Sequence, residues 1–185
     1  MGKSKVINYC GYLWEKVGEM GIFEGINPAM APLIGVYECK MDAKGRVTVP
    51  AGIKKQLAEL GAGGFILKRS VFSPCLELHT QAEWAKVTAS ISKLNRFVKK
   101  NAEFIRIFHA GVKQIEMDAA GRLLISKDLI AFAHLEGTVV FSATPFGLEI
   151  WNRAAYEDAV NPAGLDFATL AEEVMGDQSE QHDLP

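Results

Sequence analysis

Apolar and polar residues in the middle of the chain follow the pattern of a short hairpin that leads into a helix. Residues 36–41 and the β-branched segment 47–49 predict two strands that are joined by a tight turn. Pro50 suits the first turn of a helix, because its ring fixes φ and its missing N–H loses no helical hydrogen bond there. One apolar face of this predicted helix is formed by Ile53, Leu57 and Leu60.

Two further strands and a helical connector follow this hairpin and helix. The strands are predicted at 65–67 and 75–79. Thr80 and Glu83 have the spacing of a capping box, which predicts that a helix begins there. Its residues at helical spacing are Trp84, Val87, Ile91 and Leu94, and a second helical piece is predicted at 96–108.

The same order of elements then occurs a second time. Residues 35–46 and 111–122 are identical at seven of twelve positions, at an offset of 76. Leu-Glu-Leu at 76–78 matches Leu-Glu-Ile at 148–150 at an offset of 72, and the difference falls in the longer turn of the first copy. A register that is kept on both sides of a loop deletion indicates an internal duplication.

The duplication divides the chain into five predicted segments. Asn152 matches Thr80 as a second N-cap, and a short helix is predicted at 166–175, followed by a disordered end. The segments are an N-terminal extension (1–34), a first repeat (35–81), a helical connector (82–110), a second repeat (111–154), and an acidic C-terminal helix and tail (155–185).

Composition narrows the classes of protein that the chain can belong to. With 185 residues, of which 49% are hydrophobic, the chain can bury an ordinary core. It has no run of about 20 apolar residues, so we expect no membrane span. Charged residues at 15, 16 and 19 break the N-terminal apolar region, so we expect no secretory signal. Three widely spaced cysteines suggest neither a disulfide framework nor a zinc site, and a reducing cytoplasm is the expected setting. They are Cys10, Cys39 and Cys75.

Charge is distributed unevenly, although the net charge of the whole chain is only -2. Residues 35–156 hold 17 Lys and Arg against 11 Asp and Glu, whereas residues 157–185 hold eight acids and no Lys or Arg. A basic body with an acidic tail is compatible with a polyanionic partner. Solvated faces on an ordinary cytosolic protein would explain the same charges.

The most repeated stretch is the turn Met-Asp-Ala-x-Gly-Arg at 41–46 and 117–122. Asp42 and Asp118 can accept hydrogen bonds from turn amides, and Gly45 and Gly121 tolerate positive φ, so these four residues are expected to build the turns. A turn does not require the arginine that follows. Arg46 could form a local ion pair with Asp42, or Arg46 and Arg122 could contact phosphate or a guanine edge on one surface.

The doubled Asp-x-x-Gly-Arg turn, the Pro-led helix, and the strands that end in Cys-Leu-Glu-Leu and Leu-Glu-Ile-Trp resemble the MraZ family of bacterial transcriptional regulators. The resemblance covers 33–156. It implies an α+β fold, a tandem duplicated AbrB-like swapped-hairpin β-barrel with flanking helices and a pseudo-twofold within one chain. It also implies a nucleoid-associated ring-forming homo-oligomer that binds double-stranded DNA at direct repeats upstream of its own division and cell wall gene cluster, generally as a repressor.

Carried onto this chain, the resemblance implies Arg46 as the first DNA contact, with Arg122 as its counterpart. Lys44 lies in the first turn and is the next candidate, whereas the second turn has Ala120 there, so unequal contributions are expected. Ser126 stands where the family usually has a second proline, and we expect it to cap a helix instead. No metal, cofactor or small-molecule substrate is expected.

Three other classes of protein compete with this prediction. An enzyme is disfavoured because the glycine run at 62–64 follows a helix, unlike a phosphate loop, and because His79, His109 and His134 have no nucleophile or carboxylate partner at a suggestive spacing. An antitoxin of the same fold would usually be shorter and unduplicated. A ring-forming scaffold without DNA function remains open, since four apolar residues of the connector suit a subunit contact: Phe104, Ile105, Ile107 and Phe108.

Overall fold

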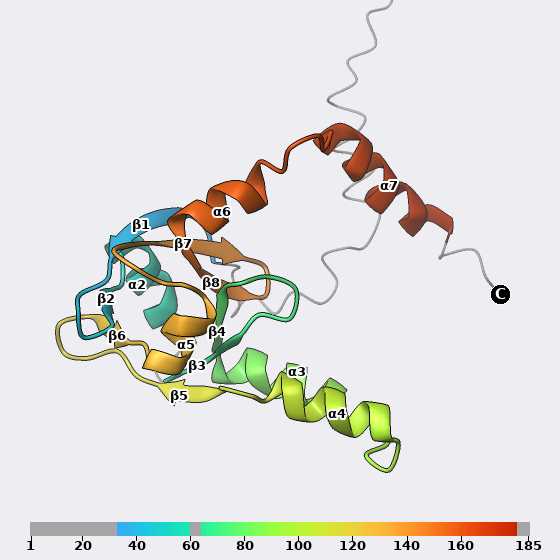
Figure 1. Cartoon of the computed structure of the whole chain (residues 1–185), viewed down its shortest axis with the longest axis horizontal. Coiled ribbons are helices and arrows are strands. Elements are labelled where there is room, and N and C mark those ends of the chain that lie inside the picture. The colour runs from blue at the N-terminus through green and yellow to red at the C-terminus, as the bar shows by residue number, and fades with distance from the viewer. Residues whose placement is uncertain (1–32, 60–63, 181–185) are drawn as a thin grey trace, which may run out of the picture. The chain divides into compact units, whose positions relative to one another are not determined.

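The computed structural model describes residues 33–59 and 64–180, all of which lie in the compact unit Pro32–Pro185. Residues 1–32 of the predicted N-terminal extension (1–34), Cys10 among them, therefore lie outside the described residues, as do Leu60 and most of the glycine run at 62–64. Leu33, at the end of the predicted extension, is buried in the core. Two sets of corresponding elements are joined by a helical connector (Figure 1).

The elements of the first half are β1 (Val36–Lys40), β2 (Arg46–Thr48), α2 (Ala51–Glu59), β3 (Phe65–Arg69) and β4 (Leu76–Thr80). The connector contains α3 (Gln81–Ser92) and α4 (Lys99–Phe108). Those of the second half are β5 (Lys113–Ile115), β6 (Arg122–Leu124), α5 (Lys127–Phe132), β7 (Thr138–Thr144) and β8 (Gly147–Asn152), followed by α6 (Arg153–Val160) and α7 (Phe167–Glu180).

The strands form two antiparallel sheets that are symmetric with respect to the two halves. The six-stranded large sheet has the order β1-β7-β8-β4-β3-β5, which reads the same when the halves are exchanged. The second sheet is a ribbon of β2 and β6. Glu77 pairs with its counterpart Glu149 in the large sheet, and Val47 pairs with its counterpart Leu123 in the ribbon. A pseudo-twofold axis therefore passes through the centre of both sheets.

Strands from the two halves are interleaved. The edge strand β1 pairs with β7 of the second half, the opposite edge strand β5 pairs with β3 of the first, and β2 pairs with β6. The expected α+β class and tandem repeat are confirmed. The expected closed barrel is not found, because β1 and β5 are edges of an open sheet and the ribbon is joined to it only by single bridges within the described chain.

The main core lies between the inner face of the large sheet, the ribbon, and the helices α2 and α5. Ile53 and Leu57 of α2 are buried as the helical spacing predicts, and Leu129 occupies the corresponding place in α5. Val47 and Leu123, at the centre of the ribbon, are completely buried. Because side chains alternate along a strand, the residues on either side of these two face outward.

The predicted helix caps are confirmed at two of three positions. Thr80 Oγ1 accepts a hydrogen bond from Glu83 N at 3.2 Å, and Asn152 Oδ1 accepts one from Ala154 N at 2.9 Å. Ser126 lies at the N-cap of α5, but its hydroxyl accepts no capping hydrogen bond, so that part of the prediction was wrong. The short helix α5 begins without this side-chain support.

The C-terminal helix is longer than the sequence pattern indicates. We predicted a helix at 166–175 followed by disorder, whereas α7 extends to Glu180. Asp166 supports its beginning, since its carboxylate accepts hydrogen bonds from Ala168 N and Thr169 Oγ1. Among the described helices, none is long and apolar enough to cross a bilayer.

Candidate nucleic-acid interface

The first turn, residues 42–46, is organised by the carboxylate of Asp42. Asp42 Oδ1 accepts hydrogen bonds from Lys44 N at 2.9 Å and from Arg46 N at 3.0 Å. The backbone closes the turn, because Gly45 N donates to Asp42 O and Asp42 N donates to Arg46 O, both at 2.9 Å. The carboxylate of Asp42 therefore holds two amides of its own turn.

The second turn, residues 118–122, repeats this arrangement. Asp118 Oδ1 accepts from Ala120 N and Arg122 N, both at 2.9 Å, and Gly121 N donates to Asp118 O at 2.8 Å. The two turn glycines have φ of 79° and 75°, in the left-handed region that a side chain disfavours. The turn-building roles predicted for the repeated Asp and Gly residues agree with this geometry.

Each turn arginine is fixed by the aspartate of its own turn. Arg46 Nε and Nη2 both lie 2.7 Å from Asp42 Oδ2, and the corresponding distances between Arg122 and Asp118 are both 2.8 Å. The local ion pair that we considered as an alternative is therefore present in both turns. Each arginine side chain is still 34% exposed, so the pair orients the guanidinium without covering it.

Ion pairing also sets the charge state of the turns. The backbone N–H of Arg46 is the largest cause that lowers the pKa of Asp42, and its guanidinium adds to the effect. The guanidinium of Arg122 is the largest cause that lowers the pKa of Asp118. Both aspartates are therefore ionised at neutral pH, and the charges of aspartate and arginine nearly cancel within each turn. An incoming anion would have to displace the carboxylate from the guanidinium or share the guanidinium with it.

The ribbon brings the two turns together. Arg46 is directly opposite Leu124 and Arg122 is directly opposite Thr48, so the two arginines lie diagonally on either side of the buried central pair. All four residues are on the outward face, since their neighbours Val47 and Leu123 face the core. The pKa of Arg122 is raised mainly by the carboxylate of Asp118 and also by the charge of Asp42.

Lysines accompany the two turns in different ways. Lys44 belongs to the first turn and is exposed. The second turn has Ala120 instead, but Lys54 of α2, from the other half, extends to it: a Cβ built at Gly121 would lie 2.9 Å from Lys54 Nζ. The corresponding contact of the first turn is apolar, since a Cβ at Gly45 would lie 2.7 Å from Ile130 Cδ1. The first turn therefore carries Lys44 within it, and the second turn has Lys54 beside it.

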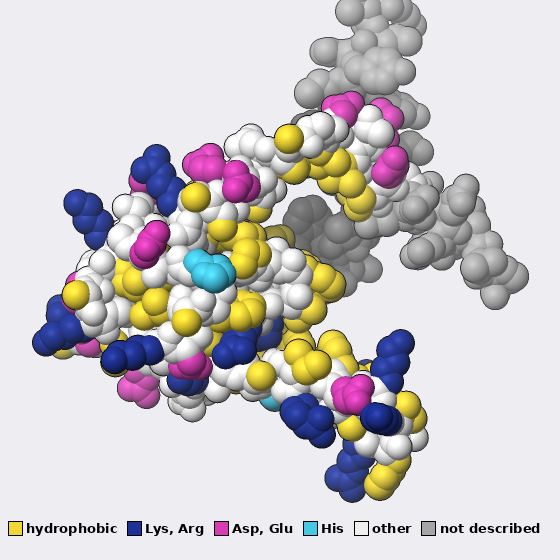
Figure 2. All heavy atoms as spheres, in the orientation of Figure 1, with side chains coloured by type: hydrophobic (Ala, Val, Ile, Leu, Met, Phe, Trp, Pro, Cys, Tyr) yellow, Lys and Arg dark blue, Asp and Glu magenta, His cyan; other side chains and the backbone are white. Residues whose placement is uncertain are grey.

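Sequence reasoning missed Lys54, Thr48 and Leu124 as components of this surface. Strand alternation next to Val47 and Leu123 was a signal that could have placed Thr48 and Leu124 on the outward face. Lys54 gave no such signal, because its proximity to the second turn depends on the interleaving of the two halves. Figure 2 shows Lys and Arg side chains over β1, β2 and β6 and over the connector, and Asp and Glu side chains over α6 and α7.

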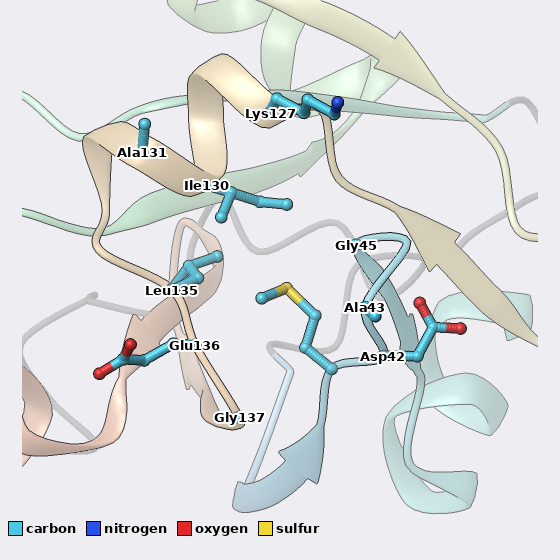
Figure 3. Close-up of a pocket in the computed structure, with 10 residues that line it drawn as sticks. Asp42, Ala43, Gly45, Lys127, Ile130, Ala131, Leu135, Glu136 and Gly137 are labelled. Atoms are coloured by element: carbon cyan, nitrogen blue, oxygen red, sulfur yellow. The ribbon is translucent and has the colours of Figure 1, made fainter.

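An open depression of about 410 Å³ adjoins the first turn. Figure 3 shows Ile130 and Leu135 pointing into it, while the carboxylate of Asp42 points away. The charged groups at its rim are Asp42, Lys127 and Glu136. Among the described residues, no group of His, Cys, Asp and Glu could hold a metal ion. The depression is an apolar hollow beside the turn.

The histidines have structural contacts. His79 is buried, with Nε2 3.2 Å from Glu77 Oε2 and Nδ1 3.1 Å from Phe146 O. We expected His79 to have no carboxylate partner, and this was wrong, because residues two apart on a strand share one face. His109 Nδ1 lies 2.9 Å from Ile105 O, and His134 has a positive φ of 48°. The two cysteines within the described residues, Cys39 and Cys75, are buried and free.

Comparisons with known proteins agree on one family. A family model described as "MraZ protein, putative antitoxin-like" matches the chain twice, at residues 33–107 and 108–177. The protein named transcriptional regulator MraZ of Christiangramia forsetii is 52% identical over 147 residues, which cover 80% of this chain and 95% of the relative. Its namesakes in Flavobacterium psychrophilum and Thermoanaerobacter sp. (strain X514) are 53% and 34% identical, over 80% and 76% of this chain and 94% of each relative.

Proposed function

The chain belongs to the MraZ family, and from this premise we propose that it is a transcriptional regulator that binds double-stranded DNA sequence-specifically through the outward face of the ribbon. The observation that carries the proposal is the pair of guanidinium groups held by Asp42 and Asp118 on one exposed face. Arg46 and Arg122 are the principal contacts, and Lys44 is the next.

A two-stranded antiparallel ribbon has dimensions that fit the major groove of B-DNA. The planar fork of arginine matches the two acceptors of a guanine edge and also the oxygens of phosphate. Because aspartate already restricts each guanidinium, less side-chain entropy is lost when DNA binds than with a free arginine. The ion pairs therefore support DNA binding by orienting the groups that make it.

The family resemblance supports a proposal for the sites of action. We propose that the chain binds direct repeats upstream of its own division and cell wall gene cluster, with repression as its main effect. One chain offers only a few cationic contacts, which are weak and salt-dependent alone. Several chains in a ring that engages spaced repeats would gain affinity through effective concentration. The exposed apolar side chains of Phe104 and Ile107 in α4 suit such a subunit contact.

We also propose that the interleaved halves form a swapped-hairpin unit of the AbrB type. In this single chain the strands of that unit are arranged in two open sheets and not in a closed barrel. The exchange of β1 and β5 between halves supports this relationship. An antitoxin-like role is the second candidate, and the wording of the family description favours it. Copurification with a small toxin would distinguish that role from operator binding.

A mobility-shift titration tests the proposal, with the full chain and DNA fragments from upstream of its own gene that hold one or several repeats. We expect tight binding only to fragments with several repeats, and loss of specific binding in Arg46→Ala with an unchanged circular dichroism spectrum. Arg153→Ala is the matched control, since Arg153 Nη2 also pairs with a carboxylate, 3.3 Å from Glu38 Oε1, but lies in α6. Sequence-selective binding that survives in Arg46→Ala would contradict the proposal.

A further inference from the structure

The outward face of the ribbon differs between the two halves at one position. Thr48 and Leu124 occupy corresponding places, next to the arginines of the opposite strand. Leu124 is 60% exposed, whereas the apolar residues on either side of it in the chain, Leu123 and Ile125, are buried in the core. Leu124 lies directly opposite Arg46 and two residues from Arg122 on the same strand, so an apolar side chain stands beside both turn arginines. An apolar side chain on a recognition surface suits an apolar feature of its ligand.

The pseudo-twofold symmetry of the ribbon makes this difference relevant to the symmetry of the DNA site. A surface with true twofold symmetry would bind a DNA site with the same symmetry. Here the symmetry of the backbone is broken by side chains at three pairs of positions, so the two ends of the ribbon present different chemistry. The pairs are Lys44 and Ala120, Thr48 and Leu124, and Lys54 and Ile130.

We propose that Leu124 is a specificity-determining residue that contacts the methyl group of a thymine, next to the base contacted by Arg46, and so gives each recognised DNA box a direction. This inference rests on the proposed DNA-binding function. Arg46 and Leu124 are directly opposite on the ribbon and share one face, so they meet neighbouring bases. Arg122 lies opposite Thr48 instead, whose side chain has no comparable apolar reach.

The chemistry of the major groove explains the choice of thymine. Hydrogen-bonding groups line the edges of guanine, cytosine and adenine, whereas the C5 methyl of thymine is the apolar feature there. A leucine placed against a polar base edge would desolvate donors and acceptors without replacing their hydrogen bonds. Contact with a methyl group has the opposite effect, because it removes apolar surface from water on both sides.

Replacement of thymine by deoxyuridine removes this methyl group and leaves base pairing intact. After the box has been located by footprinting, each thymine on both strands is replaced singly, and binding of the full chain is titrated. We expect one position at which the substitution weakens wild-type binding about fourfold, as loss of one buried methyl group implies. Leu124→Thr, which copies the first half, should bind the normal box about fourfold more weakly and no longer distinguish thymine from deoxyuridine there.

Two controls separate this effect from others. Val160→Thr changes an apolar residue of similar exposure in α6 and should keep the wild-type response at every thymine. Light scattering of Leu124→Thr should show an unchanged molecular mass. A changed mass with an unchanged thymine response would mean that Leu124 packs against a second copy of the chain, which would overturn the inference.

The outcome also distinguishes this inference from the proposed function. If wild-type binding depends on Arg46 but no thymine methyl matters, or if Leu124→Thr keeps the wild-type response, the DNA-binding function stands and the inference fails. If the wild-type chain has no sequence-selective binding, both fail.

Discussion

On the outer face of the large sheet, Glu77 of the first half stands opposite Glu149 of the second, and each accepts a hydrogen bond from an aromatic ring two residues later. His79 Nε2 lies 3.2 Å from Glu77 Oε2, and Trp151 Nε1 donates to Glu149 Oε2 at 2.9 Å. The first half adds a cation, Lys68, whose Nζ lies 2.7 Å from Glu77 Oε2, where the second half has Ser142. The duplicated backbone therefore supports two different polar clusters.

Both outward surfaces of the molecule show the same division. The paired glutamates of the large sheet and the Asp, Gly and Arg of the turns are kept in both halves, while the side chains beside them differ. Because each half supplies half of the strands of every sheet, a side-chain substitution in one half lies in a sheet whose backbone is also held by strands of the other half. Substitutions at corresponding positions can therefore test which differences between the halves matter.

The largest expected difference concerns the two glutamates. Glu77→Ala leaves the buried ammonium of Lys68 without its carboxylate and should lower the free energy of unfolding by about 3–5 kcal/mol. Glu149→Ala removes the carboxylate that accepts one hydrogen bond from the uncharged indole of Trp151, at a cost of about 1.5–3 kcal/mol, because no buried cation is left behind. Urea unfolding of both variants checks this order, and equal losses would show that Lys68 finds another partner.

The turn glycines should differ next. Both need positive φ, which costs a residue with a side chain about 1–2 kcal/mol. In Gly45→Ala the new Cβ would also lie 2.7 Å from the backbone oxygen of Ile125, whereas in Gly121→Ala it meets the flexible end of Lys54. Gly45→Ala should therefore lower the thermal midpoint more. A larger loss in Gly121→Ala would mean that the second turn is the more constrained one.

Acid should weaken the first cluster within a defined pH window. Burial alone would raise the pKa of Glu77, but hydrogen bonds from His79 and Lys68 outweigh it and lower the pKa from 4.5 to about 2. The stabilisation is therefore complete above about pH 4.5 and is lost as the pH falls towards 2, and its size is on the order of 3 kcal/mol. Glu77→Gln should flatten the pH dependence of unfolding in this window. An unchanged slope would assign the acid transition to other carboxylates.

The smallest expected effects concern the lysines of the two turns. If Lys44 and Lys54 each contact one phosphate, Lys44→Ala and Lys54→Ala should weaken DNA binding similarly, and each should reduce the salt dependence by about one unit of slope. Lys99→Ala is the control, because the Lys99 side chain is 91% exposed and lies in the connector. Titrations at several salt concentrations measure the slopes. An unchanged slope in Lys54→Ala would restrict phosphate contact to the first turn.

Local features of this fold could be predicted from the sequence. These features depend on residues that are close together in the chain. They are the turns, the hairpin strands, the caps at Thr80 and Asn152, and the buried faces of α2, β3 and β4. The pairing of β1 with β7 could not be predicted in this way, because a strand's own pattern shows which face is buried but not which distant strand lies beside it. Lys54 at the second turn was missed for the same reason. Lys68 and Glu77 lie only nine residues apart on neighbouring strands, and their contact depends on the register of that hairpin.

Interleaving of the halves has a consequence for how the chain folds during synthesis. β1 pairs with residues about 100 positions further along, so its partner leaves the ribosome roughly 5–20 seconds later at about 5–20 residues per second. During that interval the first half has unpaired strand edges and an incomplete core. The nascent first half is therefore the stage at which this protein most needs protection from aggregation, and a synonymous pause placed before β7 would lengthen it.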